Sequence, residues 1–168
     1  MKKQISTQGN TAVIVLAAIT AFALLGLFSF MAINANKALA RDAQRISDMN
    51  VIRAALSLYS QKNNGYPVSP SPLPLGIGEN KVLCSPSRDH ISAGGSPRDG
   101  IFKDNAPCNA EQVFLQSIPQ NPRPASNEYI YSSTPDGTDY NILFILETNY
   151  GALEHGAHCA KSAGITKC

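Results

Sequence analysis

The sequence TAVIVLAAITAFALLGLFSFMAINA occupies residues 11–35 and decides how the rest of the chain must be organised. It is 25 residues long and contains no charged side chain. As a helix rising 1.5 Å per residue it would be about 38 Å long, which exceeds the roughly 30 Å hydrocarbon core of a bilayer. Apolar residues would cover every side of this helix rather than a single face. The stretch therefore predicts a transmembrane helix over residues 10–36.

The residues before this helix form a short basic leader, residues 1–9, in which Lys2 and Lys3 are the charged side chains. Positive charge beside a membrane span favours the cytoplasmic side. We therefore expect a single-pass membrane protein, in contact with membrane lipid through its helix. Its N-terminus would be cytoplasmic, and residues 37–168 would form an extracytoplasmic domain.

The charge balance of the exported part excludes a basic surface. The whole chain has 14 Lys and Arg and 12 Asp and Glu. Because Lys2 and Lys3 precede the span and no acid does, residues 37–168 carry 12 charges of each sign. A neutral domain lacks the excess of Lys and Arg with which proteins neutralise phosphates. We therefore expect no nucleic-acid partner.

The chain also lacks the motifs of the common enzyme classes. It contains no phosphate-binding glycine loop, no recognisable pair of catalytic carboxylates and no G-x-S-x-G turn. The sequence therefore predicts a protein without catalytic residues and without a cofactor.

Beyond the span, an amphipathic pattern predicts that the helix continues over residues 37–62. Apolar residues recur at steps of three and four and would form one stripe, made of Leu39, Ala43, Ile46, Met49, Ile52, Leu56 and Tyr59. The charged residues fall on the other side of the helix and are expected to form a solvated face, made of Arg41, Asp42, Arg45, Asp48 and Arg53. Lys62 and Gly65, followed by Pro67, predict the end of the helix.

Two strands near the C-terminus are expected to cover the apolar stripe. EYIYSS (128–133) and DYNILFILET (139–148) are rich in aromatic and β-branched residues, and the turn sequence TPDGT (134–138) separates them. This combination predicts an antiparallel hairpin over residues 128–148. In its second strand we expect one face to pack against the helix, made of Tyr140, Ile142, Phe144 and Leu146. The predicted fold class is therefore α+β, with a long N-terminal helix packed on a small antiparallel sheet.

The rest of the exported part is divided by its cysteines, Cys84, Cys108, Cys159 and Cys168. An even number outside the membrane predicts two disulfides, and sequence proximity favours Cys84–Cys108 and Cys159–Cys168, with two other pairings still open. We expect a disulfide-looped region at residues 66–108, a short helix at 109–116 capped by Asn109, and a C-terminal loop at 149–168.

One cluster of ligand-type side chains contains His155, His158 and Cys159. On a helix the two histidines would share a face and could bind a soft metal together with the thiolate. However, Gly151, Gly156 and Gly164 argue against a helix here, and a disulfide explains Cys159 more simply. We therefore predict no metal site.

Several stretches, taken in order, resemble type IV pilins and, more closely, the pseudopilins of type II secretion. They are ARDAQRISD (40–48), IRAALSLY (52–59) followed by NGYP (64–67), LQSIPQNP (115–122), and the hairpin from YIY (129–131) to Leu146 and Glu147. The resemblance implies a pilin-like fold and a structural role in a filament. It also implies three kinds of partner: other pilin-like subunits bound through the N-terminal helix, an inner-membrane assembly machinery, and a prepilin peptidase.

The resemblance further implies how the N-terminus is processed. Family members have a leader that ends in glycine, and the residue after the cut becomes the methylated first residue. Here Gly9 is the candidate glycine and Asn10 the candidate first residue. The fifth mature position, usually glutamate in the family, is Ile14. Some minor, tip-located pseudopilins also lack that acid, so the expected role is a minor subunit.

Two other functions remain open from the sequence. One is a membrane-anchored extracytoplasmic binding module that never polymerises. Such a module would need no glutamate at the fifth mature position, where this chain has Ile14. A secreted protein could arise by cleavage after Ala40, because Ala38-Leu39-Ala40 is an A-x-A sequence of the kind that signal peptidases cut. The apolar run is longer than the roughly 7–15 residues of a signal-peptide core.

Overall fold

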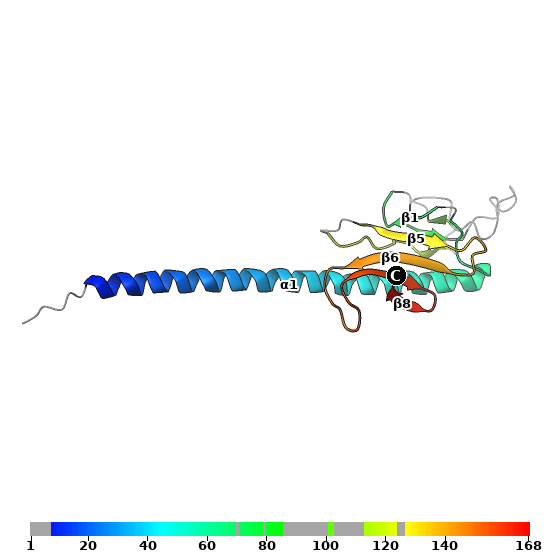
Figure 1. Ribbon diagram of the computed structural model, residues 1–168. Coiled ribbons are helices and arrows are strands. Elements are labelled where there is room, and N and C mark those ends of the chain that lie inside the picture. The colour runs from blue at the N-terminus through cyan, green and yellow to red at the C-terminus, as the bar shows by residue number, and fades with distance from the viewer. Residues whose placement is uncertain (1–7, 70, 79, 86–100, 103–112, 124–126) are drawn as a thin grey trace, which may run out of the picture. The chain divides into compact units, whose positions relative to one another are not determined.

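A computed structural model describes residues 8–69, 71–78, 80–85, 101–102, 113–123 and 127–168. The chain divides into two compact units, Met1–Ala38 and Leu39–Cys168. Among the described residues, one α-helix is followed by eight β-strands (Figure 1). The helix and an antiparallel sheet pack together in the second unit, which confirms the α+β class predicted from the sequence.

Helix α1 (Gln8–Asn63) is 56 residues long and belongs to both units. No proline interrupts it, so the backbone hydrogen bonds can continue from the apolar stretch into the amphipathic one. The helix ends as the sequence predicts. Asn64 adopts a left-handed conformation with φ of 57°, and the Gly65 N–H then donates to the Ser60 carbonyl at 3.2 Å.

Five strands form the main sheet, in the order β1-β5-β6-β7-β8, and every neighbouring pair is antiparallel. Their bounds are β1 Leu73–Leu75, β5 Tyr129–Ser133, β6 Tyr140–Leu146, β7 Gly156–Lys161 and β8 Gly164–Lys167. β5 and β6 confirm the predicted hairpin over residues 128–148. Gly137 in its turn has a φ of 67°, which a glycine adopts without strain.

A second, smaller sheet has the order β3-β2-β4 and is also antiparallel. It consists of β2 (Leu83–Cys84), β3 (Ile101–Phe102) and β4 (Val113–Leu115). The ring of Phe114 in β4 meets Tyr59 of α1 edge-on, with ring centroids 5.3 Å apart. This contact joins the smaller sheet to the C-terminal end of the helix.

The core of the second unit lies between α1 and one face of the main sheet. The alternation in β6 places Tyr140, Ile142, Phe144 and Leu146 on the buried face, which is the face that the sequence predicts. The apolar side chains of α1 with no exposed surface are Met49, Ile52, Leu56 and Tyr59. Ile46 is partly buried against the same cluster.

Leu39 departs from the predicted stripe, because its side chain is 45% exposed. Strand β6 ends at Leu146, and the chain that follows it hydrogen-bonds to Asp42 through the backbone of Glu147 and Thr148. Since the sheet ends at the level of Asp42, it does not reach Leu39, which lies almost one helical turn earlier.

The predicted short helix at residues 109–116 is wrong over its described part, because residues 113–115 form β4. Residues 109–112, with the expected cap Asn109, lie outside the described residues. Pairing with β2 and the contact of Phe114 with Tyr59 stabilise the strand. These partners are distant in sequence and override the local helix signal.

The predicted C-terminal loop at residues 149–168 is also wrong, because β7 and β8 complete the main sheet there. β7 pairs with β6 over six residues, from Asn141↔Lys161 to Leu146↔Gly156. The region at residues 66–108 likewise contains β1, β2 and β3. Short strands with weak intrinsic preference form here because neighbouring strands supply their hydrogen bonds.

Candidate functional site

The first unit presents an apolar surface on every side of α1. Each large apolar side chain from Val13 to Ile33 is more than half exposed, from 53% at Val15 to 76% at Phe22. The four consecutive residues from Val13 to Leu16 are all exposed, and successive helical residues point about 100° apart. The apolar surface therefore surrounds the helix and needs a covering of lipid or protein.

The polar side chains within this surface are satisfied by the helix itself. The Thr20 hydroxyl donates to the Ala17 carbonyl at 2.9 Å, and the Ser29 hydroxyl donates to the Leu25 carbonyl at 2.8 Å. Internal hydrogen bonds of this kind remove the cost of placing hydroxyls in hydrocarbon. By length and composition, α1 can cross a membrane, and none of its most apolar window is buried within the protein.

The candidate processing residues lie at the start of this helix. Gly9 and Asn10 belong to the first turns of α1, and the Ile14 side chain is 67% exposed. Cleavage between Gly9 and Asn10 stays a prediction.

The second unit contains a buried ionic cluster centred on Asp42, which has no exposed surface. Its carboxylate accepts hydrogen bonds from the Glu147 N–H at 3.0 Å, the Thr148 N–H at 2.8 Å and the Thr148 hydroxyl at 2.7 Å. Asp42 therefore binds the backbone that follows β6 and fixes the end of the sheet to the helix.

Arg45 lies one turn later and supplies the positive charge of the cluster. Its side chain is 2% exposed and contacts Asp42 at 2.6 Å and Glu147 at 2.6 Å. Its Nε donates to the Asn121 side chain at 2.8 Å, so Arg45 also fixes the link between β4 and β5. Arg41 forms a further ion pair with Glu147 at the rim, where the two side chains are 20% and 29% exposed.

Asp48 extends the cluster along the next turn and is itself 3% exposed. It accepts hydrogen bonds from the Tyr129 hydroxyl at 2.8 Å and from the Gln44 amide at 2.7 Å. Burial raises the pKa of Asp48, and the two hydrogen bonds oppose that effect. Burial together with the Asp48 carboxylate raises the pKa of Tyr129 well above its usual range. Tyr129 therefore acts as a neutral donor that ties β5 to α1.

The solvated face predicted for the helix is thus wrong at three of its residues, Asp42, Arg45 and Asp48. The spacing of three residues between them places them on one side of α1, and their partners follow β6 or belong to β5. Because those partners are about 80 to 105 residues away, no local pattern distinguishes this face from a solvated one.

The cluster predicts how acid affects the stability of the second unit. Hydrogen bonds from Arg41 are the main reason why the pKa of Glu147 is lowered to about 2. Partial burial opposes this shift, and a hydrogen bond from Arg45 adds to it. Because this pKa is lower in the folded state, Glu147 stabilises the fold fully at pH values above its pKa in the unfolded chain, which is near 4.5. This stability is lost as the pH falls toward 2. Asp48 has a raised pKa and acts in the opposite direction, gaining stability as pH falls.

We therefore expect Glu147→Gln to be less stable than the parent at pH 7, with the difference disappearing near pH 2. The difference at pH 7 should be about 1–2 kcal/mol, because Glu147 is partly exposed and solvent screens its ion pairs. Denaturant unfolding of both proteins at several pH values measures it. A difference that stays constant from pH 7 to pH 2 would contradict the assigned pKa.

The described cysteines of the second unit are oxidised, and one of its described histidines is buried. Cys159 and Cys168 form a disulfide, with Cα atoms 5.1 Å apart, that joins β7 to the end of the chain. Cys84 is buried and disulfide-bonded, whereas Cys108, its predicted partner, lies outside the described residues. His158 is buried with its Nε2 2.7 Å from the Glu154 carbonyl oxygen, and His155 is exposed.

The candidate metal ligands named from the sequence are His155, His158 and Cys159. Cys159 is oxidised, so it offers no thiolate to a metal beside His155 and His158. Within the part of the chain that the structure describes, no group of three His, Cys, Asp or Glu side chains could hold a metal ion.

Comparison of the chain with protein-family models, with curated proteins and with solved structures found no match.

Proposed function

We propose that this protein is a structural subunit, and a minor one, of a pilin-like filament, either a type IV pilus or a type II secretion pseudopilus. Before assembly, the N-terminal helix holds the subunit in a membrane with residues 37–168 on the extracytoplasmic side. During assembly, the helix exchanges contacts with lipid for contacts with helices of other pilin-like subunits. This exchange requires an assembly machinery at the inner membrane.

The observation that carries the proposal is the apolar surface that surrounds α1 from Val13 to Ile33. A helix that only packs on its own domain needs one apolar face, whereas this one needs a partner on every side. A bilayer and a bundle of identical helices both meet that need. The antiparallel sheet packed on the same helix in the second unit, together with the pilin-like motifs, favours a filament subunit over a simple anchor.

Ile14 is the residue that favours a minor subunit. In the resembled family an acid at this position is thought to pair with the N-terminal amine of a neighbouring subunit. The Ile14 side chain cannot form that pair. We therefore place the subunit at the filament tip, where one neighbour is missing, rather than along the shaft.

We expect the mature protein to begin at Asn10 and to carry an N-methyl group. Mass spectrometry of protein purified from its native membrane measures this directly. Gly9→Leu should block the cut and leave Met1 in place. Gly26→Ala is the matched control, because an added Cβ there would meet nothing within 4 Å, and it should be processed normally.

Two other results would overturn the filament proposal. An unmodified parent chain that still begins at Met1 would identify a membrane-anchored binding module that does not polymerise. A chain that begins at Arg41 would identify a secreted protein cut after Ala40. In that second case the whole ionic cluster, which starts at Arg41, would remain in the released domain.

A further inference from the structure

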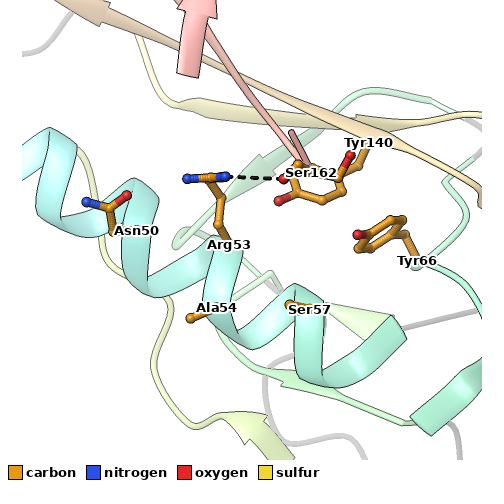
Figure 2. Close-up of a pocket in the computed structure, with 7 residues that line it drawn as sticks. All are labelled: Asn50, Arg53, Ala54, Ser57, Tyr66, Tyr140 and Ser162. Atoms are coloured by element: carbon orange, nitrogen blue, oxygen red, sulfur yellow. Dashed lines mark hydrogen bonds between the residues drawn. The ribbon is translucent and has the colours of Figure 1, made fainter. Parts of the chain in front are cut away.

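A cavity of about 320 Å³ lies beside α1 in the second unit. Four segments contribute to it: α1, the chain just after α1, strand β6, and the turn between β7 and β8 (Figure 2). Its lining residues are Asn50, Arg53, Ala54, Ser57, Tyr66, Tyr140 and Ser162. The volume falls within the range of small-molecule sites, and most of the lining side chains can donate hydrogen bonds.

Arg53 is the charged group of this cavity and is fixed in place. Its Nε donates to the Lys161 carbonyl at 2.9 Å, and one terminal nitrogen donates to the Ser162 carbonyl at 3.2 Å. Figure 2 shows the side chain reaching from α1 to Ser162, with Asn50 on one side and the two tyrosines on the other. These bonds use two of the five N–H groups of the guanidinium, and Arg53 also hydrogen-bonds the Tyr140 side chain. The remaining N–H groups are left for a ligand.

The charge of Arg53 is not neutralised by a carboxylate. The other two arginines of α1 each pair with an acid, Arg41 with Glu147 and Arg45 with both Asp42 and Glu147. Among the described residues, no Asp or Glu forms an ion pair with Arg53. The nearby Asp139 is already engaged, because it accepts from the Ser162 hydroxyl at 2.7 Å and from the Tyr140 N–H at 2.8 Å.

The two tyrosines give the cavity a firm wall. Tyr66 and Tyr140 pack edge-to-face, with ring centroids 4.7 Å apart and an interplanar angle of 67°. Burial raises the pKa of Tyr140 to about 12, opposed by the positive charge of Arg53, so its hydroxyl is a neutral donor. A ligand with negative oxygens would therefore meet a cation and several hydroxyl and amide donors, held by packed rings.

We propose that this cavity binds a carboxylate group, with Arg53 as its cationic partner and Asn50 and Ser57 as neutral donors. The N–H groups of a guanidinium lie in one plane and can donate two parallel hydrogen bonds, one to each oxygen of a carboxylate. The carboxylate belongs either to a small free acid or to an acidic side chain of a second copy of this chain. This site is independent of the apolar surface of the first unit.

The test uses the full chain in detergent micelles, labelled with ¹⁵N, and titrated with acetate over the millimolar range at constant ionic strength. The NMR signals of the Arg53 Nε–H and of the backbone N–H groups of Tyr66 and Tyr140 should shift and saturate. Arg53→Gln should weaken acetate binding by at least about tenfold, since it removes the charge-assisted bonds. Arg123→Gln, which removes the same charge from an exposed residue outside the cavity, should bind acetate as the parent does.

A second variant separates loss of the site from loss of the fold. Ser57→Leu would place a branched side chain into the cavity from an exposed helical residue and leave the bonds of Arg53 to Lys161 and Ser162 intact. It should also weaken acetate binding by at least about tenfold. Absence of a saturable shift in the parent, or binding unchanged in Ser57→Leu, would overturn the proposal.

Self-association distinguishes the two sources of the carboxylate. Sedimentation of the parent in micelles, with and without acetate, measures whether copies bind one another through this cavity. If acetate and Arg53→Gln both reduce association, the ligand is an acidic side chain of another copy. If acetate binds while association is unchanged, the ligand is a small free acid.

Discussion

Ile52→Asp is expected to destabilise the second unit by about 4 kcal/mol or more, the largest effect of any single change considered for this protein. Ile52 has no exposed surface and lies in the core between α1 and the main sheet. A carboxylate there would be buried without a partner, because the ionic cluster occupies an earlier part of the helix. The domain must then either protonate the side chain or open the contact between helix and sheet.

Val51→Asp is the matched control, because Val51 is the preceding residue of the same helix and is 44% exposed. The same charge at that position should change the free energy of unfolding by less than about 0.5 kcal/mol. Chemical denaturation in a mild detergent, followed by near-ultraviolet circular dichroism, reports on this domain. All six tyrosines lie in the second unit and the chain has no tryptophan. Equal losses in the two variants would contradict the packing of α1 on the sheet.

Arg45→Met should cost about 3–5 kcal/mol, because it leaves the buried Asp42 carboxylate without its cation. The change also releases Asn121, to which the Arg45 Nε donates, and thereby loosens the link before β5. Methionine fills a similar volume, so lost packing contributes little. Arg41→Met is the control. It removes an ion pair from the partly exposed rim and should cost far less than Arg45→Met, because solvent screens that pair.

A double-mutant cycle tests whether Asp42 and Arg45 act as a pair. Asp42→Asn removes one of the two carboxylates that pair with Arg45 and leaves Glu147 as the other, and the double variant removes both charges together. The double variant should therefore be more stable than the sum of the single losses implies, by at least about 1 kcal/mol. Additive losses would mean that the stability comes from the backbone hydrogen bonds of Asp42 alone. The unfolding measurement described for Ile52 serves here as well.

The elements that the sequence predicts correctly are those with a local cause. The apolar stretch at residues 11–35 predicts a helix long enough to cross a membrane, because length and composition are properties of the stretch itself. The steps of three and four predict the buried residues from Met49 to Tyr59, and the alternation around Gly137 predicts the hairpin and its buried face. The Cys159–Cys168 disulfide follows from proximity in the chain.

The tertiary structure decided what depends on distant partners. β7 and β8 form because β6 offers its hydrogen-bonding edge to a segment of weak strand preference, and β4 forms because β2 and Tyr59 are near it. The burial of Asp42 and Arg45 is set by the chain after β6, since desolvation depends on which atoms displace water and not on the charge of the residue itself. Arg45 pairs with the Asp42 carboxylate, whereas Arg53 donates to a backbone carbonyl. The sequence alone assigns both arginines to the same solvated face.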